Sequence, residues 1–280
     1  MFGRRSLDTK TPDQVRLMRA AGIVVAETLE LLAERARPGV TTGELDRIAE
    51  DHIRAKGARP SFAEVPGYRH TLCVSVNEEV VHGIPGARVL AEGDLVSIDA
   101  GAVLEGWHGD AAISLVVGGR EAGSAQDLGL MDATEESLWR GIAALRVGSP
   151  LHDVGAAVED TIVAHGQQRG VRYGILEDYV GHGIGTAMHE APQVPNYRVR
   201  GKGPTVRSGL TVAIEPMVTL GSEQTHVLSD EWTVATVDGS RGAHWEHSVA
   251  VSEDGVWVLT ALDGGAARLA AMGARFAPLG

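Results

Sequence analysis

The chain has 280 residues, of which 44% are hydrophobic and 22% are charged. This length suffices for one large domain or two small ones, and the ordinary charged fraction excludes global disorder. The formal net charge of -12 disfavours loose binding to nucleic acid or to an anionic membrane, because both attract basic surfaces. We therefore expect neither DNA nor a membrane as a partner.

Cysteine usage and the N-terminal residues indicate the cytosol. Cys73 is the only cysteine, so an intrachain disulfide is impossible, which fits a reducing compartment. The first residues, MFGRRSLDTKTPDQ, carry charge with no apolar stretch behind them, unlike a secretory signal. No run approaches the ~18 apolar residues that a membrane-spanning helix needs. We expect a cytoplasmic protein.

Two helices are predicted at the start of the chain. Residues 12–36 carry apolar side chains at steps of three or four, which form one stripe along a helix. Gly39 follows the last turn, where a glycine commonly ends a helix. Thr41, with Glu44 three residues later, has the pattern of a capping box. It predicts a second helix that ends near Gly57.

Strand-rich and helix-rich segments alternate in the rest of the chain. Short β-branched runs of alternating polarity predict strands, and apolar residues at helical spacing predict two further helices. The tail from residue 264 is rich in small residues and is expected to be loosely ordered. The predicted strands are 72–77, 94–101, 111–118, 211–220, 231–237, 244–251 and 255–260, and the predicted helices are 126–145 and 151–168.

The sequence contains a weak internal repeat. Residues 37–57 align with residues 146–166 at a constant offset of 109, with identities such as Gly39/Gly148 and Glu50/Glu159. One explanation is the general likeness of amphipathic helices. The other is a duplicated α+β unit, whose halves would pack about a pseudo-twofold axis with an active site at their junction.

Asp99 and Asp110 lie on two predicted strands on either side of the turn signal Glu105-Gly106. If these strands form a hairpin, the spacing of 11 residues places both carboxylates on one face, unless a bulge intervenes. Two like charges so close repel each other, and a cation between them removes that cost. Either aspartate alone is better explained as a solvated residue at a strand end.

Glu215 and Glu246 also lie on predicted strands. Glu215 interrupts the apolar run LTVAIEPMVTL, where an unpaired carboxylate is costly and tends to take up a proton. Metal coordination explains it better than exposure on an edge strand. Pro216 removes a backbone donor, so the strand lies at an edge or is bulged there. Glu246 alone is typical of an ordinary half-buried strand.

Three histidines stand in glycine-rich or turn segments. His182 lies in VGHGIGTAMHE, whose glycines let the backbone approach a ligand closely, and His189 follows seven residues later. This run lacks the spacing of a nucleotide-binding loop. His82 ends a short apolar run before a turn. A lone histidine is more often structural than a ligand. We therefore expect most of the remaining histidines to be structural: His52, His70, His108, His152, His165, His226, His244 and His247.

Together these residues form a more specific pattern than any one of them. Four carboxylates and the imidazole of His182 suit a pair of divalent cations with bridging carboxylates. Such a pair lowers the pKa of a bridging water and supplies hydroxide near neutral pH. The pattern therefore predicts a metal-dependent hydrolase. The ligands would be Asp99, Asp110, His182, Glu215 and Glu246, which accept manganese, iron, cobalt or zinc.

The order of these five residues and the phrases around them closely resemble the methionine aminopeptidases. The resemblance covers about residues 12–260 and its motifs are highly specific. It implies the pita-bread fold, an α+β fold of duplicated halves with an antiparallel sheet and pseudo-twofold symmetry. It also implies a single catalytic domain over residues 1–280, with 1–11 and 264–280 peripheral. The phrases are VSVNEEVVHGIPG, DLVSIDAG, GWHGDAAIS, VGHGIGTAMHEAPQVPNY, GLTVAIEPMV and HWEHSV.

The spacing of the last two glutamates resembles the type I enzymes. Glu215 and Glu246 are 31 residues apart, which leaves no room for the helical insertion of type II. The resemblance implies removal of the initiator methionine from nascent proteins and peptides with a small second residue. The implied chemistry uses a dinuclear metal centre and a bridging hydroxide, and the implied state is a monomer.

The resemblance implies a role for each metal ligand. Asp110 and Glu246 would bridge the ions, Asp99 would bind one of them, and His182 and Glu215 would bind the other. Glu215 would also relay protons for the attacking water.

The resemblance extends to residues that contact the substrate. His189 would steady the substrate carbonyl and the oxyanion, and His82 would contact the scissile amide nitrogen or the substrate backbone. The implied methionine pocket contains Tyr68, Cys73, Met188 and Trp232.

Three residues depart from the family pattern and affect the expected pocket. Met188 stands where the family often has phenylalanine, although a thioether can still contact a methionine side chain. Val65 stands where an aromatic residue is expected. Gly101 replaces a hydroxyl residue two positions after the first aspartate. These changes concern pocket shape and hydrogen bonds around the ligands, while all five ligands match.

Other interpretations stay open at this point. A proline-directed aminopeptidase of the same fold would usually carry a large additional N-terminal domain and different histidine phrases. A non-catalytic binding protein on this fold would typically have lost metal ligands.

The locally basic segment YRVRGKGP, residues 197–204, is best explained as a solvated loop. Its alternative role is transient contact with ribosomal RNA near an emerging chain.

Overall fold

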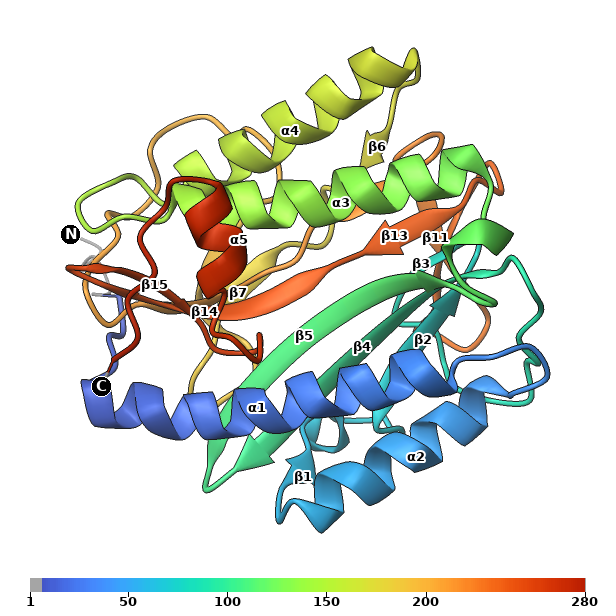
Figure 1. The fold of residues 1–280 in the computed structure, drawn as a ribbon, viewed down its shortest axis with the longest axis horizontal. Coiled ribbons are helices and arrows are strands. Elements are labelled where there is room, and N and C mark those ends of the chain that lie inside the picture. Colours follow the sequence, from blue (N-terminus) through green and yellow to red (C-terminus); the bar gives the residue numbers. More distant parts are fainter. Residues whose placement is uncertain (1–6, 280) are drawn as a thin grey trace.

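A twisted antiparallel sheet of nine strands forms the centre of the protein, with its long helices on one side (Figure 1). The computed structural model describes residues 7–279. The strand order is β1-β4-β5-β14-β9-β7-β8, and β2 pairs with β4 and β15 with β14. These strands are β1 (Arg59–Pro60), β2 (Leu72–Val76), β4 (Leu95–Leu104), β5 (Trp107–Val116), β7 (Gly181–Gly183), β8 (Glu190–Val194), β9 (Thr211–Ile214), β14 (Glu246–Ser252) and β15 (Gly255–Val258).

Two small sheets complete the β-structure of the described residues. Each has three antiparallel strands, in the orders β13-β10-β6 and β11-β12-β3. Their strands are β3 (Glu79–Val81), β6 (Gly174–Ile175), β10 (Met217–Thr219), β11 (Thr225–Val227), β12 (Val234–Thr236) and β13 (Gly242–His244).

Capping boxes fix the starts of three helices. The side chains of Thr11, Thr41 and Ser124 each accept a hydrogen bond from the backbone N–H three residues later. The side chain of that later residue accepts one from the backbone N–H of the capping residue. The box predicted at Thr41 is therefore confirmed. The helices are α1 (Pro12–Arg35), α2 (Thr42–Ala55), α3 (Ala125–Ala144), α4 (Asp153–Arg169) and α5 (Ala266–Ala271).

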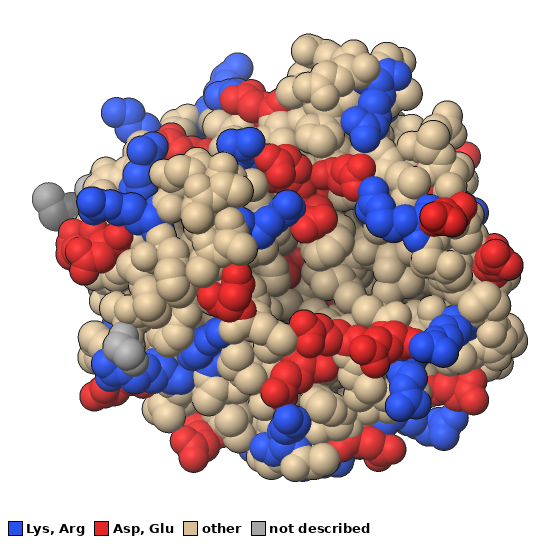
Figure 2. Space-filling model, viewed as in Figure 1, with Lys and Arg blue, Asp and Glu red and all other residues tan. Residues whose placement is uncertain are grey.

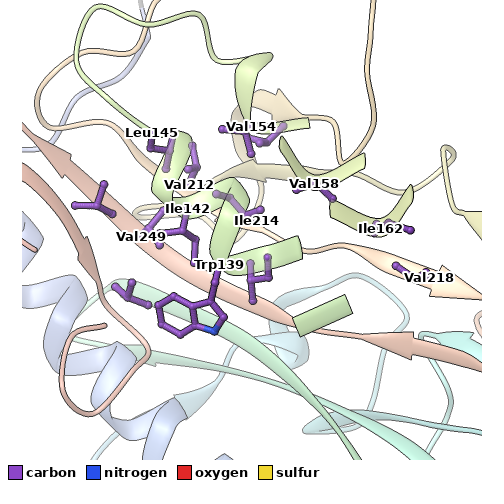
Figure 3. Packing of buried hydrophobic residues seen from close by; sticks show 14 of the residues in the cluster. Trp139, Ile142, Leu145, Val154, Val158, Ile162, Val212, Ile214, Val218 and Val249 are labelled. Atoms are coloured by element: carbon purple, nitrogen blue, oxygen red, sulfur yellow. The ribbon is translucent and has the colours of Figure 1, made fainter. Parts of the chain in front are cut away.

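The helices bury two large apolar clusters against one face of the sheet. In the second half of the chain, Trp139 and Ile142 of α3 and Val158 of α4 pack against Ile214 of β9 and Val249 of β14 (Figure 3). A separate cluster joins α1 and α2 to β2, β4 and β5. Since successive strand residues face opposite ways, the residues that alternate with these apolar side chains point away from the helices.

The two halves of the chain have corresponding parts. In each half a pair of helices precedes the central strands, α1 and α2 before β4 and β5, then α3 and α4 before β9 and β14. The halves meet where β5 pairs with β14. The fold has the pita-bread architecture of an α+β protein, as expected, and the junction of the halves lies at the centre of the large sheet.

The helix α1 crosses β5 at an unusually close distance, which glycines permit. A Cβ atom added to Gly109 of β5 would lie 2.8 Å from the Cα atom of Gly22 in α1. A Cβ atom on Gly22 would collide with the backbone carbonyl of Leu259. The absence of side chains at both positions brings the backbones of helix and sheet together.

Two predicted strands are interrupted. The run 211–220 divides at Glu215-Pro216 into β9 of the large sheet and β10 of a small sheet, because proline cannot continue the ladder. The run 244–251 divides at Trp245, and His244 ends β13 before Glu246 begins β14. In both runs the chain changes sheets beside a predicted metal ligand.

The tail is more ordered than expected. Residues 266–271 form α5, whose Leu269 is buried, and Phe276 pairs with Val256 in an isolated bridge. At the other end, residues 1–6 of the segment predicted to be peripheral lie outside the described residues. Lys10 is buried and pairs with Glu190 at 2.7 Å and with Asp8.

None of the helices in residues 7–279 is long and apolar enough to cross a membrane.

On the helix-bearing face, acidic and basic side chains alternate in small groups, and the middle of the face is hollowed (Figure 2). The net charge of -12 is therefore not gathered into one area of this face.

Candidate metal centre

The five predicted ligands come from five neighbouring strands of the large sheet. Asp99 lies on β4, Asp110 on β5, Glu246 at the start of β14, Glu215 directly after β9, and His182 on β7. Residues far apart in the sequence therefore converge on one region. The apolar residues next to them in sequence belong to the clusters packed under the helices, so the ligands occupy the opposite face.

The strand register explains how the carboxylates meet. Asp99 pairs with Ala112, and Ala112 pairs with Glu246 on its other side. Asp110 pairs with Gly101 and is therefore diagonal to Asp99 on the same face. The predicted hairpin and common face are confirmed, because β4 and β5 pair without a bulge around the turn at Glu105-Gly106.

Burial sets the electrostatics of the four carboxylates. It raises the pKa of Asp99 to about 8. Burial, with repulsion from neighbouring carboxylates, raises the pKa values of Asp110, Glu215 and Glu246 well above their ordinary values. Four acids this close in a largely buried site cannot all be ionised without compensating positive charge.

Unpartnered oxygens show that the group fits divalent cations. Asp99 Oδ1, Asp110 Oδ1 and Glu246 Oε1 are buried without a hydrogen-bond partner within the described part of the chain. Ligand atoms of Asp110, His182 and Glu246 lie within 4.8 Å of one another. Hard carboxylate oxygens with one imidazole nitrogen are a donor set for first-row divalent metals.

His182 has the tautomer that a metal ligand needs. Its Nδ1 lies 2.9 Å from the carbonyl oxygen of Gly183, so the N–H is placed on Nδ1 and donates to that carbonyl. The unprotonated Nε2 then faces Glu215, whose Oε1 lies 3.4 Å away. Burial, with help from His189, lowers the pKa of His182 to about 4, which keeps the ring neutral and able to coordinate.

His189 and His82 flank the carboxylates. The rings of His182 and His189 are 4.4 Å apart between centroids, and burial lowers the pKa of His189. His82 has a left-handed backbone conformation, with φ of 60°, and its ring meets the ring of Tyr179 edge-on. Burial, with help from His189, lowers the pKa of His82 to about 4. Both rings therefore stay neutral near pH 7.

An apolar pocket opens beside the carboxylates. Tyr68, Cys73 and Met188 form one buried cluster with Phe62, and Trp232 and Val65 pack against it. The hydroxyl of Tyr68 donates to the carbonyl of Leu72 at 2.6 Å, which fixes the ring. A cavity of about 170 Å³ joins this pocket to the carboxylates. It is lined by all the predicted ligands and contact residues: Tyr68, Cys73, His82, Asp99, Asp110, His182, Met188, His189, Glu215, Trp232 and Glu246.

Three residues near the site were not predicted from the sequence: Phe62 and Val81, which line the cavity, and His244, which lies close to two of the carboxylates. Phe62 supplies part of the apolar wall, and its position beside the expected pocket residues in the sequence was the available signal. His244, predicted to be structural, has its Nε2 3.9 Å from Glu246 Oε2 and 4.0 Å from Glu215 Oε2. The break at Trp245, between β13 and β14, leaves His244 on the small sheet and close to these two carboxylates.

Gly101 makes room for a serine. A Cβ atom at position 101 would lie 2.8 Å from Ser61 Cβ and 3.2 Å from Asp110 Oδ1. Ser61 is fully buried and its hydroxyl is 3.1 Å from His108 Nδ1. In this chain the space beside Asp110 is thus occupied by a hydroxyl residue from another segment.

The fold and this site define a metal-dependent peptidase. Residues 16–253 match the sequence profile of metallopeptidase family M24, and the chain belongs to that family. It is similar to methionine aminopeptidase 1 from Mycobacterium tuberculosis, at 51% identity over 92% of this chain and 96% of the relative.

Solved structures agree with this assignment. A methionine aminopeptidase from Thermotoga maritima superposes with a TM-score of 0.86 at 39% identity, covering 91% of this chain and 99% of that one. A prolidase from Pyrococcus furiosus gives a TM-score of 0.71 at 20% identity, over 90% of this chain and 65% of that one. That likeness shows a shared fold only. The resemblance to the methionine aminopeptidases is confirmed.

Proposed function

We propose that this protein removes the N-terminal methionine from nascent proteins and peptides in the cytoplasm, by metal-dependent hydrolysis. The observation that carries the proposal is the cavity in which four carboxylates and His182 adjoin an apolar pocket. A peptide bond would be cleaved at the carboxylates while an unbranched apolar side chain occupies the pocket. The 51% identity to methionine aminopeptidase 1 supports the same activity.

Asp99, Asp110, His182, Glu215 and Glu246 would hold two divalent ions, manganese, iron, cobalt or zinc. When bound, the ions supply Lewis acidity and lower the pKa of a water held between them. The carboxylates, which repel one another in the buried site, would then carry charges that the ions compensate. Asp110 and Glu246 are suited to a bridging role, because their strands lie side by side at the junction of the halves.

The chain's own residues would bind the substrate and move its protons. Glu215, whose Oε1 lies 3.4 Å from His182 Nε2, would accept a proton from the attacking water. His189 would donate an N–H to the substrate carbonyl oxygen and stabilise the oxyanion that develops there. His82, whose backbone has a left-handed conformation, would contact the nitrogen of the scissile amide. All three surround the same cavity.

The pocket would select methionine through its shape and its polarisable side chains. Tyr68 and Trp232 meet edge-on, with ring centroids 5.0 Å apart, and Met188 and Cys73 add polarisable sulfur atoms. These groups are apolar walls for a thioether chain. As the resemblance to the methionine aminopeptidases implies, a peptide with a small second residue would be preferred.

Release of methionine from the peptide Met-Ala-Ser tests the proposal. We expect chelator-treated protein to be inactive and added Mn²⁺ or Co²⁺ to restore release. Glu215→Ala and His189→Ala should each reduce the restored rate by about 100-fold or more. An N-acetylated Met-Ala-Ser peptide is the control for the need for a free amine and should not be cleaved.

The same assay separates the two alternatives. Faster cleavage of Ala-Pro than of Met-Ala-Ser would replace this specificity with a proline-directed one. Folded protein that releases nothing with any of the four metals would indicate a binding protein.

In the basic segment, residues 197–204, the guanidinium of Arg198 pairs with Asp160 of α4 at 2.6 Å. This ion pair favours the solvated-loop interpretation over ribosome contact.

A further inference from the structure

His244 approaches the metal centre from a different sheet than the ligands. It ends β13, where it pairs with Met217 of β10, and only 1% of its surface is exposed. Its Nε2 lies 3.9 Å from Glu246 Oε2 and 4.0 Å from Glu215 Oε2. This nitrogen has no hydrogen-bond partner in the part of the chain that the structure describes. The ring therefore faces two proposed ligands of the centre without contacting either.

Two serines hold the backbone of His244 in place. Its N–H donates to Ser114 Oγ at 2.9 Å and to Ser97 Oγ at 3.2 Å, and its carbonyl accepts from Ser114 Oγ at 2.9 Å. The two hydroxyls are 2.8 Å apart. Ser97 and Ser114 belong to β4 and β5, the strands that carry Asp99 and Asp110. The backbone of His244 is thus fixed relative to the strands of the ligands.

A buried polar atom without a partner is costly, and the nearby acceptors here are carboxylate oxygens. A movement of about 1 Å would bring Nε2 within hydrogen-bond distance of either oxygen. Donors that orient ligating carboxylates are a regular part of metal sites, and their loss typically lowers metal affinity by about 10- to 100-fold.

We propose that His244 is a positioning residue of the metal centre, whose Nε2–H orients the carboxylates of Glu215 and Glu246 and so increases the affinity for divalent cations. This inference rests on the metal centre of the proposed function. It requires a donor at this point in space rather than an imidazole as such. Glutamine, whose amide N–H reaches a similar distance, should therefore replace histidine, and leucine should not.

His247 offers a matched control on the same segment. It is also buried, at 8% exposure, but its Nδ1 is 2.8 Å from Thr260 Oγ1 and its ring meets Trp139 edge-on under the helices. His244 lies two residues before Glu246 and His247 directly after it, yet only His244 faces the carboxylates. A change at His247 perturbs the core without altering a donor to the centre.

Calorimetric titration of chelator-stripped protein with Mn²⁺, at one fixed pH, tests the inference. His244→Leu should raise the Kd by about 10- to 100-fold, whereas His244→Gln and His247→Gln should stay close to the wild-type value. Thermal unfolding of each metal-free variant checks that it is folded. His244→Gln keeps the test valid if the leucine variant does not fold.

Three outcomes would overturn the inference. Wild-type affinity in a folded His244→Leu would show that no donor is needed. Affinity of His244→Gln as low as that of His244→Leu would show that the imidazole acts in another way, such as direct coordination. Absence of Mn²⁺ binding by the wild-type protein would overturn the metal centre itself, and the inference with it, whereas wild-type binding with unaffected variants overturns the inference alone.

Discussion

The side chains of the metal centre couple the stability of the protein to pH. Burial raises the pKa of Asp99 to about 8 in the folded state, compared with about 3.9 in an unfolded chain. The folded protein therefore binds more protons than the unfolded one between these values, so stability falls as pH rises through this window. Asp110, Glu215 and Glu246 are shifted in the same direction.

We expect the free energy of unfolding of metal-free protein to decrease between about pH 5 and pH 8. Saturating Mn²⁺ should remove most of this decrease, because the cations compensate the ionised carboxylates. Urea denaturation at several pH values, with and without Mn²⁺, measures both effects. Asp99→Asn should flatten the metal-free profile. A metal-free stability that is constant or increases over this range would contradict the electrostatic account.

Local spacing was sufficient to predict part of the site at the level of residues. Asp99 and Asp110 share a face because a tight hairpin fixes their register within a few residues. The position of His244 could not be predicted in this way, since it depends on the pairing of β13 with β10. The position of Ser61 could not be predicted either, because this serine fills the space beside Gly101 from a separate segment.

At the level of elements, the close crossing of α1 over β5 leaves no room for a side chain at the contact. Gly22 of α1 lies against the carbonyl of Leu259 and the backbone of Gly109. In most helices, replacing glycine with alanine gains up to about 1 kcal/mol of stability. Here the added methyl group meets backbone atoms, which cannot rotate away as a side chain can.

Gly22→Ala should therefore destabilise the protein, by about 1–3 kcal/mol. Ala20→Gly at an exposed position of the same helix is the control, and it should lose about 1 kcal/mol from helix propensity alone. Urea denaturation of the three proteins gives both values. If Gly22→Ala were more stable than the wild type, the packing of α1 on the sheet would differ from that described.

The elements themselves were largely predictable, and their interruptions were not. The amphipathic stripe and the capping box define α1 and α2 locally. The breaks at Pro216 and Trp245 send each strand into a second sheet, and only long-range pairing determines where a strand continues. Pro216 indicated an irregularity, while Trp245 carries no comparable signal.

At the level of the whole molecule, the two halves place their carboxylates symmetrically. Asp99 and Asp110 come from the paired strands β4 and β5, and Glu215 and Glu246 come from the paired strands β9 and β14 or their ends. The site lies where β5 meets β14. The sequence repeat at an offset of 109 residues indicated this duplication, but only the sheet order shows that the junction is also the centre of the ligands.

The central claim is that the four carboxylates and His182 hold divalent ions. Its most direct test is the metal content of chelator-stripped protein after equilibrium dialysis against Mn²⁺, measured by elemental analysis beside Asp110→Asn. The account predicts about two ions per chain in the wild type and a clear loss in the variant. A folded wild-type protein that retains no ion, or a variant that retains as many as the wild type, would contradict it.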